Sequence, residues 1–245
     1  MKRTKNPAKE AEYRKRAADL VAQMTLHEKV SQMLSWAPAI ERLGIPAYNW
    51  WSEGIHGVGR AGTATVFPQA IGMAAAFDED MMEQVGNAVG VEARGKYNMC
   101  RAHGDRDIFK GLTVWAPNIN IFRDPRWGRG HETYGEDPFL TSRLGVRFVE
   151  GMQGDDPDYL QAAACAKHFA VHSGPESDRH HFNAIVSKQD LWETYLPAFR
   201  ALVKEAGVEA VMGAYNRTNG EPCCGSKTLL KDILRDKWHF DGHVT

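Results

Sequence analysis

The first part of the chain has the hydrophobic periodicity of helices. An amphipathic helix is predicted over residues 10–24, where apolar side chains recur at Tyr13, Ala17, Leu20, Val21 and Met24. Residues 25–28 follow as TLHE, in which a threonine hydroxyl and a glutamate carboxylate can each bind a free backbone N–H. This capping box predicts a second helix that presents Val30, Met33 and Leu34.

Short apolar runs then alternate with helical patterns. Strands are predicted over residues 112–115, 162–166 and 208–214, and an irregular strand over 116–121. Helices are predicted to begin at the caps Asp78, Ser187 and Ser226 and near Pro138. The helix after Asp78 should extend to about residue 94, the one after Ser187 to about residue 204, and the one from Pro138 to about residue 152. The helix after Ser226 should carry Leu229, Leu230, Ile233 and Leu234. The inward face of the helix after Asp78 should carry Met81, Met82, Val85, Val89 and Val91.

Alternating strands and helices of this length are typical of βαβ units around a mainly parallel sheet. The chain has 245 residues, and about 250 is usual for one (β/α)8 barrel. Residues 240–245 (FDGHVT) look like the start of a further strand that is cut short. We therefore predict an α/β fold, a TIM-like (β/α)8 barrel incomplete at the C-terminus. Residues 1–35 would form a helical lead-in and residues 36–245 the partial barrel.

Composition excludes several classes of partner. A formal net charge of -1 gives no basic excess for nucleic acid or for an anionic membrane surface. No stretch is apolar enough to span a bilayer, and the charged first twenty residues do not resemble a signal peptide. The compartment stays open, since an export signal can be removed. The four cysteines have no zinc spacing and are expected to be free thiols, mostly buried.

Polar side chains follow the predicted strands, where a parallel barrel gathers its working residues. They include Lys167-His168, Tyr215-Asn216 and the loop 123–129. With Glu53 as an acceptor, and with Lys167, His168 and the arginines as donors, such a pocket suits a neutral polyol. Simpler interpretations are open for single residues: an ion pair at Lys167, a core histidine at His168, and a salt bridge between Arg129 and Glu132.

Two other motifs carry little weight. Residues 57–62 match G-x-G-x-x-G, but no strand precedes them and the sequence after them starts a helix poorly. A metal-dependent hydrolase would need a ligand cluster. Its candidates are His168, His172, His180 and His181, which lack a supporting HExxH or carboxylate spacing. Neither a metal nor a cofactor is expected.

Six ordered motifs resemble glycoside hydrolase family 3, and the resemblance runs from about residue 17 to the end. They are WWSEGIHG (50–57), FPQAIG (67–72), RDPRWGR (123–129), ETYGEDP (132–138), KHF (167–169) and MGAYN (212–216). The resemblance implies retaining hydrolysis of terminal non-reducing β-linked sugars, usually glucosides or xylosides. In that mechanism one carboxylate attacks the anomeric carbon and another protonates the leaving oxygen.

The resemblance also implies which residues hold the sugar: Glu53, Arg129, Lys167, His168, Arg179 and Tyr215. Glu53 stands where many members have Asp, and the Glu form resembles the xylosidase-like branch. Members also tend to have a non-proline cis peptide near the Lys-His pair, so one is predicted at Lys167-His168.

The motif at residues 240–245 normally runs into Ser-Asp, and that Asp is the nucleophile. It is therefore expected just beyond Thr245, and the acid/base residue in a later domain of the same polypeptide. No catalytic residue is assigned within the chain, and the isolated chain is expected to be inactive. The alternative is a remnant that binds carbohydrate without cleaving it.

Overall fold

Four parallel strands form the centre of the structure, a computed structural model that describes residues 3–245. They are β3 (Thr113–Val114), β4 (Ala163–Phe169), β6 (Ala210–Gly213) and β9 (His243–Val244). Their order in the sheet, β3-β4-β6-β9, follows the chain. Parallel neighbours in chain order are the arrangement of a (β/α)8-type barrel, here with four of its strands among the described residues.

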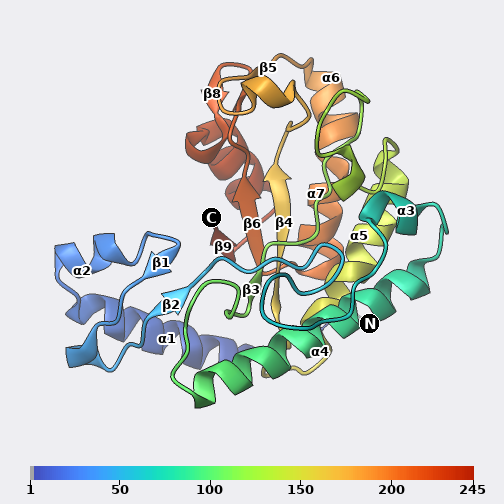
Figure 1. Cartoon of the computed structure of the whole chain (residues 1–245). Helices are drawn as coiled ribbons and strands as arrows, with labels where there is room; N and C mark the ends of the chain where they lie inside the picture. Colours follow the sequence, from blue (N-terminus) through green and yellow to red (C-terminus); the bar gives the residue numbers. More distant parts are fainter. Residues whose placement is uncertain (1–2) are drawn as a thin grey trace.

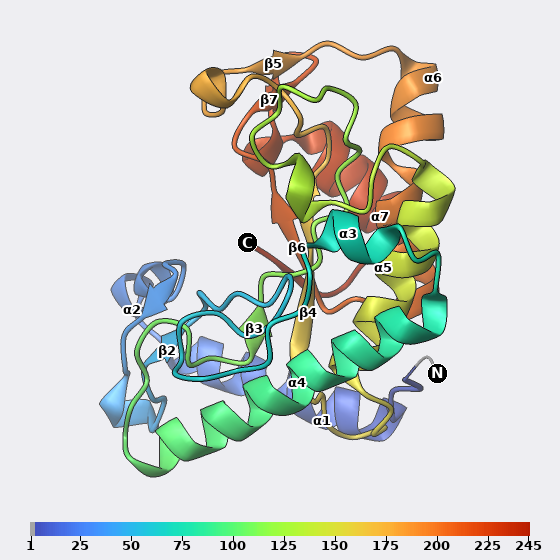
Figure 2. The ribbon, with the colours of Figure 1, turned by 45° about the vertical axis from the view of Figure 1, so that its right-hand side comes forward.

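Helices connect these strands and cover one side of the sheet (Figures 1 and 2). They are α4 (Glu79–Ala102), α5 (Pro138–Gln153) and a segment in which α6 (Lys188–Asp190) and α7 (Pro197–Ala201) alternate with π-helical turns at Leu191–Tyr195 and Leu202–Ala206. Glycine allows α4 and α5 to approach closely. A Cβ at Gly151 would lie 2.0 Å from the Glu83 carbonyl oxygen.

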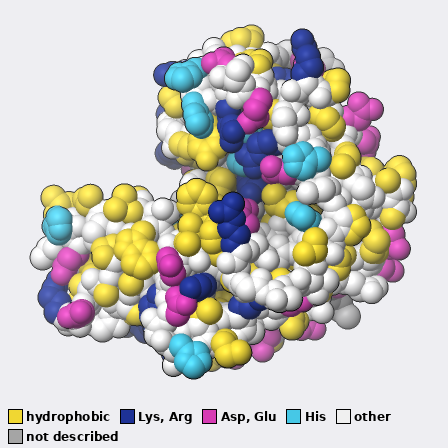
Figure 3. Space-filling view, viewed as in Figure 1, with side chains coloured by type: hydrophobic (Ala, Val, Ile, Leu, Met, Phe, Trp, Pro, Cys, Tyr) yellow, Lys and Arg dark blue, Asp and Glu magenta, His cyan; other side chains and the backbone are white. Residues whose placement is uncertain are grey.

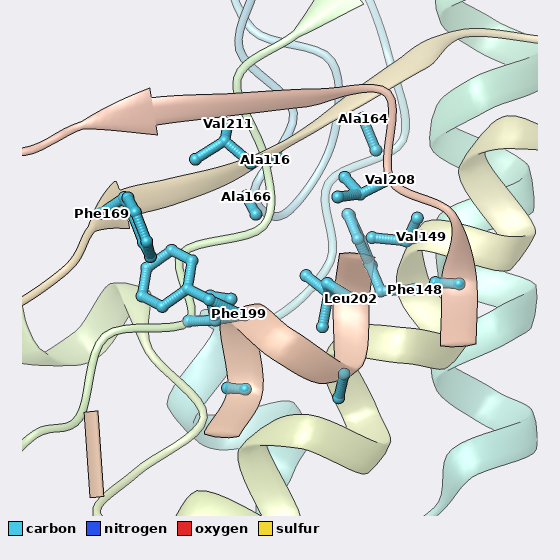
Figure 4. Close-up of a cluster of buried hydrophobic side chains, with 14 of the residues drawn as sticks. Ala116, Phe148, Val149, Ala164, Ala166, Phe169, Phe199, Leu202, Val208 and Val211 are labelled. Atoms are coloured by element: carbon cyan, nitrogen blue, oxygen red, sulfur yellow. The ribbon is translucent and has the colours of Figure 1, made fainter. Parts of the chain in front are cut away.

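The hydrophobic core lies between the sheet and these helices (Figure 4). Phe169 of β4 packs edge-on against Phe199 of α7, with ring centroids 4.9 Å apart. Leu202 and Val211 are fully buried in the same cluster. Burying a side chain of this size contributes roughly 1.5–3 kcal/mol, so this core holds β4 firmly where it carries Lys167 and His168.

The N-terminal segment forms a lobe at the left of Figure 1. It contains α1 (Pro7–Gln23), α2 (Leu26–Ser31), and the antiparallel strands β1 (Trp36–Ala37) and β2 (Tyr48–Asn49). Hydrogen bonds from Arg3 to the Asp156 and Pro157 carbonyls tie its beginning to the barrel. The division at residue 35 stays a prediction.

The remaining elements are short. Helix α3 (Ala70–Ala74) precedes α4, and β5 (Asn183–Ala184), β7 (Arg217–Thr218) and β8 (Glu221–Pro222) make a small separate sheet. A π-helical segment, Lys227–Lys237, leads to β9, and 3-10 turns lie at Glu41–Leu43, Gly130–Glu132, Glu176–Asp178 and Cys223–Gly225. Within residues 3–245, no helix combines the length and hydropathy needed to cross a bilayer.

The predicted caps are confirmed. Thr25 and Glu28 form the reciprocal capping box, and Asp78, Ser187 and Ser226 each accept a hydrogen bond from a backbone N–H of the helix that follows. All four cysteines are free, with Cys165 and Cys223 buried.

Three details of the helices were wrong. The second helix ends at Ser31, because the chain turns into the β1–β2 pair, and Met33 and Leu34 are exposed. The helix after Asp78 continues to Ala102 instead of ending near residue 94. Val91 is 53% exposed, because two residues of helix turn it to the opposite face from Val89.

Candidate active site

The C-terminal edge of the parallel strands carries the candidate site. Lys167 and His168 lie near the end of β4, and Tyr215 follows β6. Single bridges place Ser52 beside Val114 and Asn118 beside Lys167, so the segment with Glu53 joins the same edge. Figure 3 shows basic, acidic and histidine side chains gathered where the surface is hollowed between the N-terminal lobe and the upper part of the molecule.

Glu53 and Lys167 form an ion pair across this edge. The Lys167 Nζ lies 3.1 Å from Glu53 Oε2, and the side chains are 3% and 34% exposed, respectively. The ammonium is thus buried while its carboxylate partner still faces solvent. An ammonium in such a place is stable only with charge partners and hydrogen bonds.

Arg129 lies beside this pair and is held at two points. Its Nε and Nη2 donate to the two Glu132 oxygens at 2.8 and 2.6 Å, the bidentate geometry that best fixes a guanidinium. Its Nη1 lies 3.1 Å from His168 Nε2. The predicted salt bridge between Arg129 and Glu132 is therefore present, and it orients an arginine that also reaches His168.

The hydrogen bonds of His168 define its tautomer. Asn120 Nδ2 donates to the carbonyl oxygens of His168 and Ala170 at 2.8 and 3.1 Å. Because carbonyls only accept, the Asn120 Oδ1 must be the atom that faces His168 Nδ1, 3.0 Å away. Nδ1 therefore carries the proton. A guanidinium only donates, so Nε2 accepts from Arg129.

This corrects one expectation from the sequence. His168 was expected to donate a hydrogen bond to a ligand, with Lys167 and the arginines. In the structure its donor is taken by Asn120, and the atom on the Arg129 side is an acceptor. The physical reason is the fixed orientation of the Asn120 amide.

Burial and charge keep the site in one protonation state. Burial, followed by the charges of Arg129 and Lys167, holds the pKa of His168 well below its usual 6.5. Burial alone would raise the pKa of Glu132, but the Arg129 hydrogen bonds and charge outweigh it, and the pKa lies below its usual value. Near neutral pH the imidazole is thus neutral and the Glu132 carboxyl ionised.

A second histidine adjoins the first. The ring centroids of His168 and His172 are 4.6 Å apart, and Trp127 meets His172 edge-on at 5.7 Å. His172 Nδ1 donates to Asn216 Oδ1 at 3.1 Å, since the Asn216 Nδ2 is committed to two backbone carbonyls. Burial lowers the pKa of His172 to about 4, although the Asn216 bond opposes that shift.

Arg179 and Tyr215 lie at the outer edge of the site. Arg179 forms an ion pair with Glu176, and its charge lowers the pKa values of both His168 and His172. The Tyr215 ring lies 6.3 Å from that of His172 and is 58% exposed. The structure therefore brings all six residues named from the sequence to one region, with Lys167 and His168 buried and these two partly open.

A separate cavity of about 540 Å³ borders the site. Its lining includes Trp127, Ser173, Glu176 and Phe182, but none of the six residues named from the sequence. It shares a wall with the site, because Trp127 contacts His172 and Glu176 pairs with Arg179.

The predicted cis peptide is present between Lys167 and His168. Two further cis bonds, Ala116-Pro117 and Phe169-Ala170, were not predicted. No group of three or more candidate metal ligands occurs within the part of the chain that the structure describes. Both ring nitrogens of His168 are in any case engaged by Asn120 and Arg129.

Several functional neighbours were missed from the sequence. Asn118 and Asn120 were read only as part of an irregular strand, and Asn216 only as a strand end. The N-x-N spacing in an extended segment places two amides on one face, which is a pattern that could have identified the first two. No local pattern indicates that Asn216 holds His172, because that contact spans 44 residues.

Parallel strands with polar side chains gathered at their C-terminal edge define an α/β barrel, the class in which this edge usually holds the ligand site. Residues 16–245 match the family model for the glycosyl hydrolase family 3 N terminal domain. The chain belongs to this family, and its fold is an incomplete form of the barrel.

Curated relatives include a xylan 1,4-beta-xylosidase from Xylanibacter ruminicola, 52% identical over 232 residues that cover 93% of this chain and 27% of the relative. A beta-xylosidase/alpha-L-arabinofuranosidase from Medicago sativa subsp. varia is 42% identical over 245 residues, or 94% of this chain and 31% of that protein. The chain thus spans less than a third of the length of these relatives.

Solved structures also resemble this chain. A GH3 exo-beta-xylosidase (XlnD) in complex with a xylobiose aziridine probe superposes with a TM-score of 0.84 at 37% identity, over 94% of this chain and 31% of that one. A beta-glucosidase from Streptomyces venezuelae in complex with D-glucose gives 0.78 at 36% identity, over 94% and 28% of the two chains.

Proposed function

We propose that this chain supplies the sugar-binding pocket of a retaining β-glycosidase that acts on terminal non-reducing β-linked sugars. The observation that carries the proposal is the Glu53–Lys167 ion pair beside the Arg129–His168 hydrogen bond. Lys167 and Arg129 offer donors at one strand edge, and Glu53 offers an acceptor. A sugar hydroxyl both donates and accepts, so such a pocket can satisfy it fully and can discriminate against a ligand that lacks it.

Within this pocket we assign sugar binding to Glu53, Arg129, Lys167, His168, Arg179 and Tyr215. Glu53 and Lys167 would hold neighbouring hydroxyls, with Arg129, oriented by His168 Nε2, on a third position. Arg179 and Tyr215 would close the outer side. No metal or cofactor takes part in this proposal.

The carboxylates of the pocket suit binding better than proton transfer. Glu132 is held by Arg129 with a pKa below its usual value, whereas a general acid needs a pKa raised toward the working pH. Glu53 faces the Lys167 ammonium. We therefore assign neither as nucleophile or acid/base, the two carboxyl groups that retaining hydrolysis requires.

For the sugar, we propose a β-xyloside before a β-glucoside. Two observations support this order: Glu53 has the form found in the xylosidase-like branch, and the relatives described above include a xylan 1,4-beta-xylosidase at 52% identity. A β-glucoside is the second choice, because the beta-glucosidase at 36% identity is in complex with D-glucose.

The test is hydrolysis by the full-length protein that contains this chain, measured on p-nitrophenyl β-D-xyloside and β-D-glucoside. We expect xyloside cleavage with the larger kcat/KM. Glu53→Gln should lower kcat/KM by roughly 10- to 100-fold, because a hydrogen bond to a charged group contributes about 1.5–3 kcal/mol. Glu193→Gln, on an exposed helical turn, is the matched control and should change little.

Two results would contradict the proposal in different ways. Sugar binding that depends on Glu53, with no cleavage of either substrate, would favour the alternative of a carbohydrate-binding protein that does not hydrolyse. If wild type and Glu53→Gln hydrolyse the substrates equally fast, the pocket has no part in the mechanism.

A further inference from the structure

The site contains a closed ring of hydrogen bonds. Asn120 Oδ1 accepts from His168, whose Nε2 accepts from Arg129. Arg129 donates to Glu132, and Asn118 Nδ2 donates to Glu132 Oε2 at 3.3 Å. Asn118 Oδ1 then accepts from the Asn120 backbone N–H at 3.1 Å, which closes the ring.

Two asparagines thus hold the two partners of the Arg129–His168 hydrogen bond. Asn120 binds His168 directly, and Asn118 binds Glu132, which holds Arg129. The two asparagines are 1% and 2% exposed, and they lie two residues apart on an extended segment, so their side chains share a face. That segment pairs with β4, since Asn118 forms a bridge with Lys167 and the Ile119 N–H donates to the Lys167 carbonyl at 2.9 Å.

Asn120 forms three hydrogen bonds with His168 and a fourth with Ala170. Its Oδ1 accepts from both the backbone N–H and the ring Nδ1 of His168, at 2.9 and 3.0 Å. Its Nδ2 donates to the carbonyls of His168 and Ala170. The amide cannot rotate without losing all four bonds, so it can present only an acceptor to the ring.

We propose that Asn120, supported by Asn118, is a positioning residue that locks His168 as the Nδ1–H tautomer, so that Nε2 accepts from Arg129 and holds its guanidinium where the remaining N–H groups can donate to a sugar hydroxyl. The part that concerns the sugar rests on the proposed function. The locked tautomer itself does not depend on the proposed function. A sugar hydroxyl then accepts from the Arg129 guanidinium or the Lys167 ammonium and donates to the Glu53 carboxylate, so the direction of each hydrogen bond is fixed.

The direct test measures the ring nitrogens of His168 by ¹H–¹⁵N spectroscopy on the ¹⁵N-histidine-labelled full chain, over about pH 5 to 8. The His168 resonances are identified by their loss in His168→Gln. We expect the wild type to show neutral imidazole with the proton on Nδ1 throughout. A wild-type ring protonated on Nε2 would overturn the proposal without any need for a variant.

The decisive variant is Asn120→Asp, which keeps the size and the acceptor but adds a negative charge and removes the two Nδ2 donations to the His168 and Ala170 carbonyls. The charged groups that act on His168 are Arg129, Lys167 and Arg179, with His172 as the titratable neighbour, and all oppose protonation. A carboxylate at position 120 counters them, so we expect His168 to become imidazolium as the pH falls within this window. The matched control is Asn49→Asp, another buried asparagine that binds a backbone N–H, and it should leave His168 neutral.

Kinetics of the full-length protein give the second readout. Protonated Nε2 cannot accept from Arg129 and repels its guanidinium, so KM for the aryl xyloside should rise about tenfold per pH unit below the new titration point in Asn120→Asp. A variant that only loosened the fold would lose activity equally at all pH values. If Asn120→Asp leaves both the spectra and the pH profile unchanged, the proposal is overturned. If the wild-type ring is locked as expected and no glycoside is cleaved, the positioning role stands and the proposed function fails.

Discussion

The floor and the rim of the pocket are built differently. On the floor, Lys167 and His168 are 2% and 3% exposed and lie in a strand, with every polar group of the His168 ring bonded. On the rim, Tyr215 is 58% exposed, and Arg179 sits just after a 3-10 turn and pairs with Glu176.

The difference indicates where the geometry is fixed before a ligand arrives. Floor residues need no reorganisation, because core packing and the asparagine-linked ring already hold them, and such pre-organisation reduces the entropy lost on binding. Rim residues still have freedom to adjust. Changes to the floor should therefore cost more than changes to the rim.

The largest effect is expected at Lys167. Lys167→Met removes one partner of a largely buried ion pair, which typically costs about 3–5 kcal/mol. Because Glu53 is one third exposed, we expect the lower end of that range in the free energy of unfolding, together with loss of detectable xylose binding. Urea denaturation and calorimetric titration measure the two quantities.

The matched control for Lys167→Met is Lys5→Met. Lys5 pairs with Glu209 at 3.0 Å, but both side chains are about 30% exposed. A pair of this kind contributes roughly 0–1 kcal/mol. Equal losses of stability in the two variants would contradict the distinction between the floor and the rest of the surface.

The next effect is a dependence of stability on pH. The folded-state pKa of His172 is about 4, below its ordinary 6.5, so the unfolded chain binds more protons between these values. Stability is then complete above about pH 6.5 and falls as the pH drops toward 4, by up to about 3 kcal/mol. His168 acts in the same direction.

Urea denaturation at several pH values tests this slope. His172→Asn should flatten it, although the variant starts from a lower stability at neutral pH. His181→Asn serves as the control, because that ring is 86% exposed. A slope unchanged in His172→Asn would show that His172 is not the buried neutral group described here.

The smallest effect is expected at the rim. Tyr215→Phe removes a hydroxyl from an exposed ring while its contacts with His172 and His180 persist. We expect sugar affinity to fall about two- to tenfold, the value of one ordinary hydrogen bond, with little change in stability. A loss of sugar affinity as large as that of Lys167→Met would contradict the expectation that changes to the floor cost more than changes to the rim.

Much of the fold could be predicted from the sequence because its determinants are local. Capping residues such as Thr25, Asp78 and Ser226 mark helix starts through bonds to nearby N–H groups. The six pocket residues were found because the ordered motifs resemble those of the family. Contacts across long stretches of chain could not be predicted in this way, such as Asn120 with His168, 48 residues apart, or the tautomer that this contact imposes.

The most direct measurement of the central claim is a crystal structure of the protein with D-xylose at saturating concentration. The account predicts one pyranose at the C-terminal edge of β4, with hydroxyls within hydrogen-bond distance of Glu53, Lys167 and Arg129. A sugar bound instead only in the neighbouring cavity lined by Ser173 and Phe182, with Glu53 and Lys167 still paired only to each other, would contradict it.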